Sequence, residues 1–144
     1  MDAKKFGADS QVVVAGDFNA RIGELKNEVA KEEARERRSQ DKVVDARGKR
    51  LMKLMNKAGL YVVNGVKEEA DFTFEHANGE GASVIDLIWV SESAEVGTCE
   101  EWSEASCCIG DHSLVAVDIQ GRIEEVEVKK RKEGWNKVTE EWNL

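Results

Sequence analysis

An apolar run leads directly into polar residues in the stretch QVVVAGDFNARIG, residues 11–23. Its first part, QVVVA, is rich in β-branched residues and is bounded by Ser10 and Gly16. A run this short predicts a strand buried on both faces, as in α/β sheets. Asp17 and Asn19 then stand where the strand ends. Both types are common in turns because their side chains bond to nearby backbone, so the pattern leaves a turn and a catalytic site open.

The rest of the chain predicts one clear helix and several strands. Asp45 is placed to cap the helix, and Gly59 to end it. Its apolar stripe would consist of Leu51, Leu54, Met55 and Ala58. Strands are predicted for LYVVNG from Leu60, DFTFEH from Asp71, SVIDLIWVS at 83–91, residues 95–102 and SLVAVDIQ from Ser113.

Two charged segments interrupt this pattern. Residues 24–38 are two-thirds charged, which predicts a solvated surface helix or a mobile insertion. The C-terminal stretch GWNKVTEEWNL predicts a short amphipathic helix with Trp135, Val138 and Trp142 on one face. Its apolar face would pack on the core or dock on a partner.

Length and composition restrict the class of protein. With 144 residues, 41% of them hydrophobic, the chain is expected to form one globular domain. No apolar window is long enough for a signal peptide or a membrane span, so an intracellular location, nuclear or cytoplasmic, is expected. The three cysteines match no zinc or disulfide spacing and are expected to be reduced. The net charge of −8 disfavours tight, non-specific binding of nucleic acid.

Polar residues recur where the predicted strands end: Asp17 with Asn19, Ser83 with Asp86, and Asp111 with His112. Each pair alone is a weak signal. Asp86, however, lies within an apolar strand, where a carboxylate is costly unless a donor such as the His112 imidazole meets it. An imidazole held in this way can stabilise a phosphoryl oxygen.

The other members of these pairs complete a chemical inventory. Asp111 could bind a hard cation such as Mg²⁺, which prefers carboxylate oxygen and water. Asp17 could accept a proton from an attacking water, and Asn19 could position a phosphate. Together these groups describe metal-assisted hydrolysis of a phosphodiester.

The ordered motifs GDFN (16–19), SVID (83–86) and GDH (110–112) resemble the C-terminal half of the endonuclease/exonuclease/phosphatase family. The resemblance covers about Gln11 to Ile119. GDFNARIG and GDHSLVAV are most similar to endonuclease domains of RTE-type non-LTR retrotransposons and to the craniofacial development protein 2 class. GDFNARIG argues against a third possibility, a phosphatase branch of the family that acts on lipid or inositol phosphates.

The resemblance implies roles for individual residues. Asp17 would align or activate the water, and Asn19 would orient the phosphate. Asp86 would pair with His112, the imidazole that contacts phosphate, and Asp111 would be a metal ligand.

Three further residues are assigned to the substrate side of the site by the same resemblance. Thr73 and Phe74 match a position near the substrate groove, and Ser83 would support the strand geometry. His76 matches no motif and is expected to be structural.

The resemblance implies an α/β fold that is half of a four-layer α/β sandwich, a mixed β-sheet with helices on one face. Residues 1–122 would form this partial domain, and residues 123–144 a charged extension with the short C-terminal helix. The family's first half supplies an Asn, a metal-binding Glu and a Tyr or His, none of which can be located here. Mg²⁺-dependent DNA cleavage is therefore expected to be weak or absent.

A half sandwich would also expose an apolar sheet face larger than soluble monomers usually tolerate. The chain is therefore expected to form a homodimer, or to dock on another polypeptide, through that face. The alternative function is a non-catalytic, retrotransposon-derived module for dimerisation or protein interaction.

Overall fold

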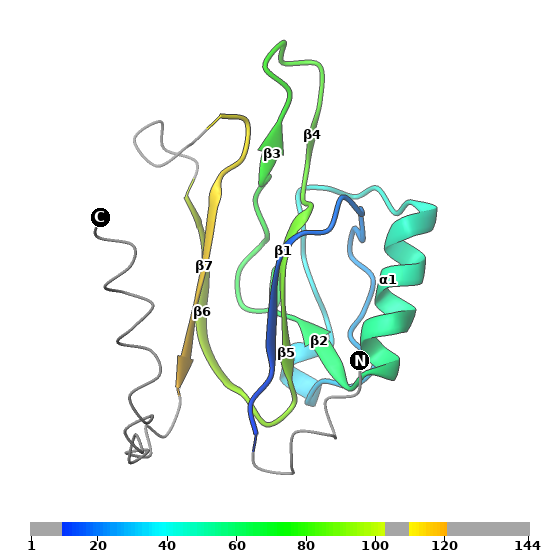
Figure 1. Ribbon diagram of the computed structural model, residues 1–144, viewed down its shortest axis with the longest axis vertical. Coiled ribbons are helices and arrows are strands. Elements are labelled where there is room, and N and C mark those ends of the chain that lie inside the picture. The colour runs from blue at the N-terminus through cyan, green and yellow to red at the C-terminus, as the bar shows by residue number, and fades with distance from the viewer. Residues whose placement is uncertain (1–9, 103–109, 121–144) are drawn as a thin grey trace, which may run out of the picture.

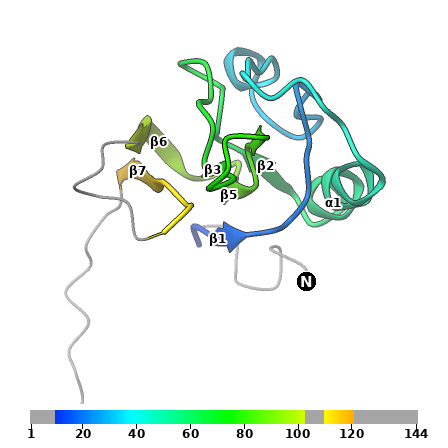
Figure 2. The ribbon, with the colours of Figure 1, turned by 90° about the horizontal axis from the view of Figure 1, so that it is seen from above.

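Three layers make up the part of the chain that the structure describes, residues 10–102 and 110–120 of this computed structural model. A three-stranded sheet lies in the middle, with helix α1 (Ala46–Lys57) on one side and the paired strands β6 (Glu95–Trp102) and β7 (Leu114–Gln120) on the other (Figures 1 and 2). The predicted α/β class is confirmed, and the arrangement is compatible with half of an α/β sandwich.

The central sheet has the order β1 (Val13–Asp17), β5 (Asp86–Ser91) and β2 (Leu60–Val62), with both strand pairs antiparallel. Successive side chains of a strand point to opposite faces. On β5, Leu87 and Trp89 therefore join one core cluster, and Ile88 and Val90 join a second one. The buried strand β5 thus divides the core into two parts.

Helix α1 covers the first cluster through Met52 and Met55, together with its C-cap residue Ala58. The cap is as predicted, because the Asp45 side chain accepts a hydrogen bond from the Gly48 N–H. The predicted apolar stripe was wrong at Leu54, which is 57% exposed. Met52 is buried instead, so the buried face of the helix lies closer to Met52 than predicted.

The second cluster lies between the sheet and the β6–β7 pair. Val96, Val115, Val117 and Ile119 pack against it, and so does Ala34 of the short 3₁₀ helix η2 (Glu32–Ala34). Strands 95–102 and 113–120 were both predicted, and β6 and β7 lie there as an antiparallel ladder.

The segments predicted as continuous strands from Asp71 and over 83–91 are shorter than expected. The structure has instead the two-residue strands β3 (Phe74–Glu75) and β4 (Ala82–Ser83), which form a hairpin that projects beyond the central sheet (Figure 1), while β5 begins only at Asp86. Where the chain passes from β4 to β5, the N–H groups of Ile85 and Asp86 bond to the side chain of Thr73 instead of to a strand. The strand pairing of β4 with β3 therefore ends before β5 begins.

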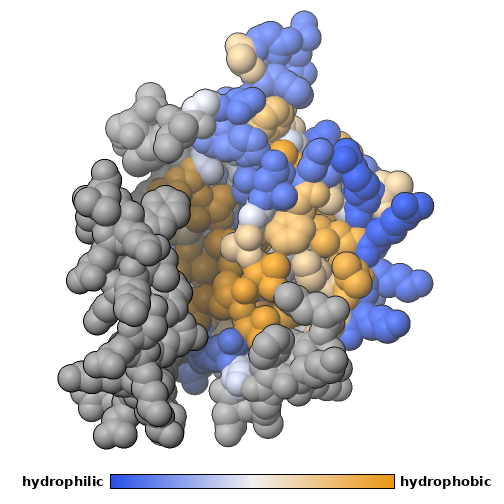
Figure 3. Space-filling model, in the orientation of Figure 1, coloured by the Kyte–Doolittle hydropathy of each residue, from blue (hydrophilic) through white to orange (hydrophobic). Residues whose placement is uncertain are grey.

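The prediction that residues 11–15 are buried on both faces was wrong. Strand β1 is an edge strand, and Val13 is 46% exposed. A β-branched run is equally suited to an edge, where the pleated surface is covered on one side only. Space-filling atoms show apolar side chains gathered in the middle of the face on which β1 lies (Figure 3).

Most of residues 24–38 are exposed, as expected of a surface segment, but the prediction of a solvated helix was wrong. Only three of these residues are helical, and the segment buries Asn27, Ala30, Ala34 and Arg37. Its polar side chains are bonded inside the fold: Asn27 donates to the carbonyls of Ala34 and Val62 and accepts from the Val62 N–H. These internal contacts could not be predicted from the sequence, because a highly charged segment normally indicates solvent exposure.

The predicted C-terminal helix, the extension 123–144 and two of the cysteines, Cys107 and Cys108, lie outside the described residues. Within the part that is described, no helix is long and apolar enough to cross a membrane.

Candidate active site

Two carboxylates meet because of the strand register between β1 and β5. The ladder pairs Asp17, the last residue of β1, with Asp86, the first residue of β5. Directly opposed residues in an antiparallel pair have their Cβ atoms about 5 Å apart. The end of β1 and the start of β5 are 69 positions apart in the sequence. They therefore present their carboxylates side by side at the same end of these two strands.

His112 completes this group from the turn that precedes β7. Its Nδ1 lies 2.9 Å from Asp86 Oδ2, and its Nε2 lies 4.0 Å from Asp17 Oδ2. The turn is held to the β3 segment by main-chain bonds, from Glu75 N–H to Asp111 O and from Ser113 N–H to Thr73 O. The structure thus brings together Asp17, Asp86 and His112, which the sequence had placed in three separate motifs.

The surroundings of His112 favour its charged form. The hydrogen bond with Asp86 raises the pKa of the imidazole, partial burial opposes this, and the charges of Asp86, Asp17 and Asp111 raise it further. The imidazole therefore carries more positive charge at neutral pH than an ordinary histidine. Because Nδ1 is engaged by Asp86, Nε2 is the ring nitrogen that faces Asp17.

Asn19 lies beside Asp17 in a turn with unusual backbone geometry. Its φ is +45°, a left-handed conformation that Asn tolerates better than most residues. The Asn19 N–H donates to Asp17 Oδ1 at 2.8 Å. The turn therefore fixes one oxygen of Asp17 and leaves Oδ2 directed towards His112.

Thr73 and Ser83 lie inside the fold behind this group. Thr73 is fully buried, and its Oγ1 accepts the N–H groups of Ile85 and Asp86, each at 3.1 Å. Ser83 is also buried, and its carbonyl accepts the Thr73 N–H. Both residues hold the backbone from which Asp86 projects.

Phe74 forms an aromatic contact with the imidazole of His112. The two ring centroids are 5.0 Å apart, and the ring of His76 lies 4.8 Å from Phe74 on an edge-to-face contact. Phe74 therefore limits how the His112 ring can rotate.

Asp111 is exposed and lies outside the compact group. The ligand atoms of Asp17, Asp86 and His112 all lie within 4.8 Å of one another, and Asp111 does not belong to this set. It lines a groove between the β3–β4 hairpin and the turn at 110–113, together with His112, Glu75 and His76. From this groove, the negative charge of Asp111 helps to raise the pKa of His112.

The donor set suits a hydrated divalent cation. Asp17 is exposed, Asp86 and His112 are half-buried, and the open side leaves room for water ligands. Asp86 Oδ2 is engaged by His112, so Asp86 would offer its other oxygen. This Asp86 oxygen and a carboxylate oxygen of Asp17 are the atoms that would hold the cation.

Sequence reasoning missed Asp41, a buried carboxylate next to the site. Both of its oxygens bond to the Arg21 guanidinium, at 2.6 and 2.9 Å, and it also accepts the N–H groups of Val43 and Val84. Burial opposes ionisation of Asp41, but these hydrogen bonds outweigh it and lower its pKa. Nothing in the local pattern SQDKVV distinguishes such a residue from a surface aspartate.

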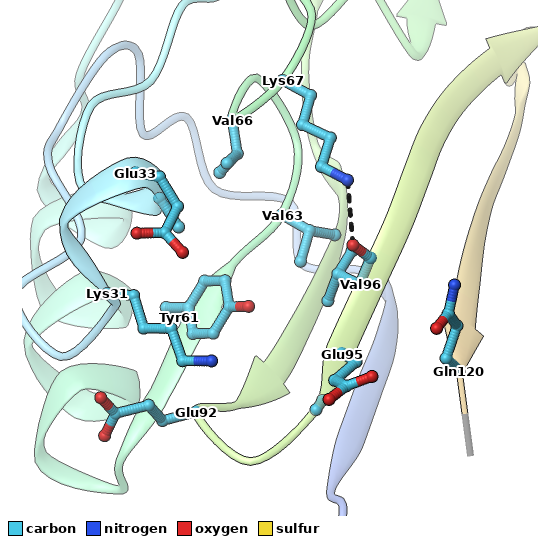
Figure 4. Close-up of a pocket in the computed structure, with 12 residues that line it drawn as sticks. Lys31, Glu33, Tyr61, Val63, Val66, Lys67, Glu92, Glu95, Val96 and Gln120 are labelled. Atoms are coloured by element: carbon cyan, nitrogen blue, oxygen red, sulfur yellow. Dashed lines mark hydrogen bonds between the residues drawn. The ribbon is translucent and has the colours of Figure 1, made fainter.

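A second cavity, of about 440 Å³, lies at the opposite end of β5 (Figure 4). Tyr61, Val63 and Val96 form its apolar part, and Lys31 and Glu92 lie at its margin. In the described part of the chain, no ion pair joins its side chains. Burial, with the charges of Glu33 and Glu92, raises the pKa of Tyr61 and keeps its hydroxyl neutral.

The comparisons with known proteins gave one result. A sequence model of the family described as endonuclease-reverse transcriptase matches residues 3–116, well over half of the chain. The comparison with curated proteins gave no match, and neither did the comparison with solved structures.

Proposed function

Because the chain belongs to the endonuclease-reverse transcriptase family, a nuclease-like function is supported, and we propose that its site hydrolyses phosphodiester bonds of DNA with a bound divalent cation. The observation that carries the proposal is that ligand atoms of Asp17, Asp86 and His112 lie within 4.8 Å of one another. We place the chain nearest to the RTE-type and craniofacial development protein 2 classes on the strength of GDFNARIG and GDHSLVAV.

His112 acts on the phosphate in this proposal. Asp86 holds Nδ1 at 2.9 Å, so the protonated ring directs its Nε2–H at a non-bridging phosphoryl oxygen. The hydrogen bond to Asp86 raises the pKa of His112 and so favours the protonated form of this donor. The imidazolium thereby stabilises the negative charge that develops on phosphorus-bound oxygen.

Asp17 acts on the attacking water. Its Oδ2 is 4.0 Å from His112 Nε2, which is enough for a water or a phosphate oxygen to lie between them. The Asn19 N–H on Oδ1 keeps the carboxylate oriented, so that Oδ2 aligns the water and receives its proton. A Mg²⁺ held by Asp17 and Asp86 would supply Lewis-acid stabilisation of the phosphate.

The remaining assignments rest on the resemblance of the motifs, and among these residues only Asp111 lines the groove beside His112. The exposed carboxylate of Asp111 is proposed to assist the cation through bridging water, the Asn19 amide to orient the phosphate, and Phe74 to border the bound strand. Thr73 and Ser83 support the site from within the fold.

The activity of this chain by itself is proposed to be weak. Among the described residues, only Asp17 and Asp86 offer carboxylate oxygen at the compact group, so a cation would depend mostly on water ligands. The net charge of −8 also repels DNA at long range.

A nicking assay on supercoiled plasmid at low salt with Mg²⁺ tests the proposal. Wild-type protein is expected to nick slowly, and Asp17→Asn, His112→Asn and added chelator are each expected to abolish the nicking. Glu92→Gln, an exposed carboxylate beyond the far end of β5, is the matched control and should cleave like the wild type. Equal nicking by wild type and His112→Asn would refute the proposed site.

A second candidate function, self-association as a non-catalytic interaction module, is favoured by the outer edge of β1, with which no other described strand pairs. The Ser91 N–H bonds to Val12 O and the Phe18 N–H to Ile85 O. Main-chain groups alternate along an antiparallel strand, so those of Val13, Ala15 and Asp17 point away from β5. A strand edge with apolar side chains is a template for pairing with another strand, and we propose that a second copy of this chain pairs with this edge.

Solution mass measured by light scattering tests this second candidate. A dimer is expected at about twice the monomer mass of 16.0 kDa, and Val13→Lys should convert it to the monomer because a charge blocks the edge. Val43→Lys is the control, since Val43 is equally exposed, at 46%, but lies outside the strands. A monomeric wild-type protein would contradict the candidate.

A further inference from the structure

The start of β5, which carries Asp86, lacks a neighbouring strand on one side. The β2–β5 ladder ends where Val62 is paired with Trp89, and one more main-chain bond joins Val63 N–H to Ile88 O. The chain then turns away at Gly65, which has a φ of +82°. The main chain of β2 therefore does not reach Asp86.

The side chain of Asn64 takes the place of the missing strand. Its Oδ1 accepts the Ile88 N–H at 2.9 Å, and its Nδ2 donates to the Asp86 carbonyl at 3.2 Å. A side-chain amide has the same kinds of donor and acceptor as a peptide group. Asn64 thus continues the ladder past the point where the β2 backbone leaves it.

Both main-chain polar groups of Asp86 depend on side chains as a result. Because Asp86 and Asp17 form a non-hydrogen-bonded pair, the N–H and C=O of Asp86 point away from β1. Thr73 Oγ1 accepts the N–H, and Asn64 Nδ2 donates to the C=O. The backbone position of the carboxylate that holds His112 is set by these two residues.

Asn64 is itself held by a buried cation. Asn64 is 0% exposed, and Arg37 Nε donates to its carbonyl at 2.8 Å. Arg37 Nη1 also donates to the carbonyls of Gly23 and Leu25, in the segment that follows the Asp17 turn. Burial lowers the pKa of Arg37 to about 10, so the guanidinium remains charged at neutral pH.

We propose that Asn64 is a positioning residue for the Asp86–His112 pair, with Arg37 fixing Asn64 from behind. Removal of the amide leaves the Asp86 carbonyl and the Ile88 N–H without these bonds, and the first residues of β5 then move. The carboxylate is no longer held at hydrogen-bond distance from His112 Nδ1. The positioning role is independent of the proposed function. Only the use of the Asp86–His112 pair in catalysis rests on it.

The hydrogen-bonded imidazole N–H proton of His112 gives a readout that does not require catalysis. The chain has two histidines, His76 and His112, so His112→Asn assigns the signal in a proton NMR spectrum at fixed pH. The wild-type protein is expected to show a downfield, slowly exchanging proton from the 2.9 Å bond to Asp86. In Asn64→Ala this signal is expected to be lost.

Val62→Ala is the matched control, because Val62 is equally buried, at 0% exposed, and lies two residues away on β2. It weakens the core without removing a bond to Asp86, so the His112 signal should remain. If Asn64→Ala does not fold, Asn64→Ser serves in its place, since one hydroxyl cannot reach both Asp86 O and Ile88 N. Persistence of the signal in a folded Asn64 variant would overturn the proposal.

Kinetics separate this proposal from the proposed function. If the wild type nicks DNA, Asn64→Ala is expected to lower kcat about tenfold with KM little changed, as is usual for residues that orient ligands. An unchanged kcat in folded protein would also contradict the positioning role. If the wild type does not nick DNA, the proposed function fails, and the NMR comparison still decides the role of Asn64.

Discussion

His112 Nδ1 lies 2.9 Å from Asp86 Oδ2, although the two residues belong to elements that the β6 strand separates in the sequence. The bond joins the start of β5 to the turn before β7. It is therefore both a part of the candidate site and a tertiary contact that holds the β7 segment to the central sheet.

The pH dependence of stability follows from this bond. The pKa of His112 is raised in the folded protein, so its contribution to the free energy of unfolding is fully present below the unfolded pKa of about 6.5. The contribution is lost as the pH rises through the folded pKa, which lies above that value. Urea unfolding of wild type and His112→Asn should therefore differ most below about pH 6.5. A difference that grows with rising pH would contradict the assignment.

Gly48→Ala is expected to destabilise the protein strongly. A Cβ at Gly48 would lie 1.9 Å from the Arg21 carbonyl oxygen, so helix α1 or the loop after Asn19 must move. Overpacking of this kind costs about 1–3 kcal/mol, and contact with a backbone atom places it at the upper end. Thermal unfolding measures the loss. Lys49→Ala, exposed on the next position of the same helix, should change stability by less than about 0.5 kcal/mol.

Arg21→Gln is expected to leave Asp41 as a buried carboxylate without its cation. The N–H groups of Val43 and Val84 still bond to it, so we expect a loss of roughly 2–4 kcal/mol in the free energy of unfolding. Lys26→Gln removes one partner of the exposed pair Lys26–Glu36 and should cost less than about 1 kcal/mol. Equal losses for the two variants in urea unfolding would contradict the burial of the Asp41 carboxylate.

Asp17→Asn is expected to weaken the binding of Mn²⁺, used as a paramagnetic substitute for Mg²⁺, by at least about tenfold, because one of two carboxylates is removed. Paramagnetic broadening of the His112 signals measures the binding. Glu92→Gln should bind as the wild type does. Broadening that is the same in Asp17→Asn and wild type would place the cation elsewhere.

Much of the local structure could be predicted because it depends on neighbouring residues. Asp45 and Gly59 bound helix α1 as expected, since capping is a matter of three or four adjacent residues. Val13 shows the limit of such patterns: a β-branched residue favours a strand whether the strand is central or at an edge. Leu54 shows the same limit on a helix, where the buried face depends on what the helix packs against.

The residue types of the site were visible in the motifs GDFN, SVID and GDH, and their order indicated the family to which the chain belongs. The supporting residues were not visible. Asn64 stands in an Asn-Gly pair, which usually indicates a turn, and Arg37 stands in a run of charges. Each is buried because it meets unpaired backbone groups of distant segments.

The sequence by itself determined helix α1, most of the strands and the residue types of the candidate site, because these depend on short-range propensity and residue type. Only the tertiary structure decided that Asp17 is paired with Asp86, that β1 lies at an edge, and that Arg37 and Asn64 lie behind the site. These outcomes depend on strand register and on the partners available to buried polar groups. Both are set by contacts between segments far apart in the chain, so they cannot be predicted from a local pattern.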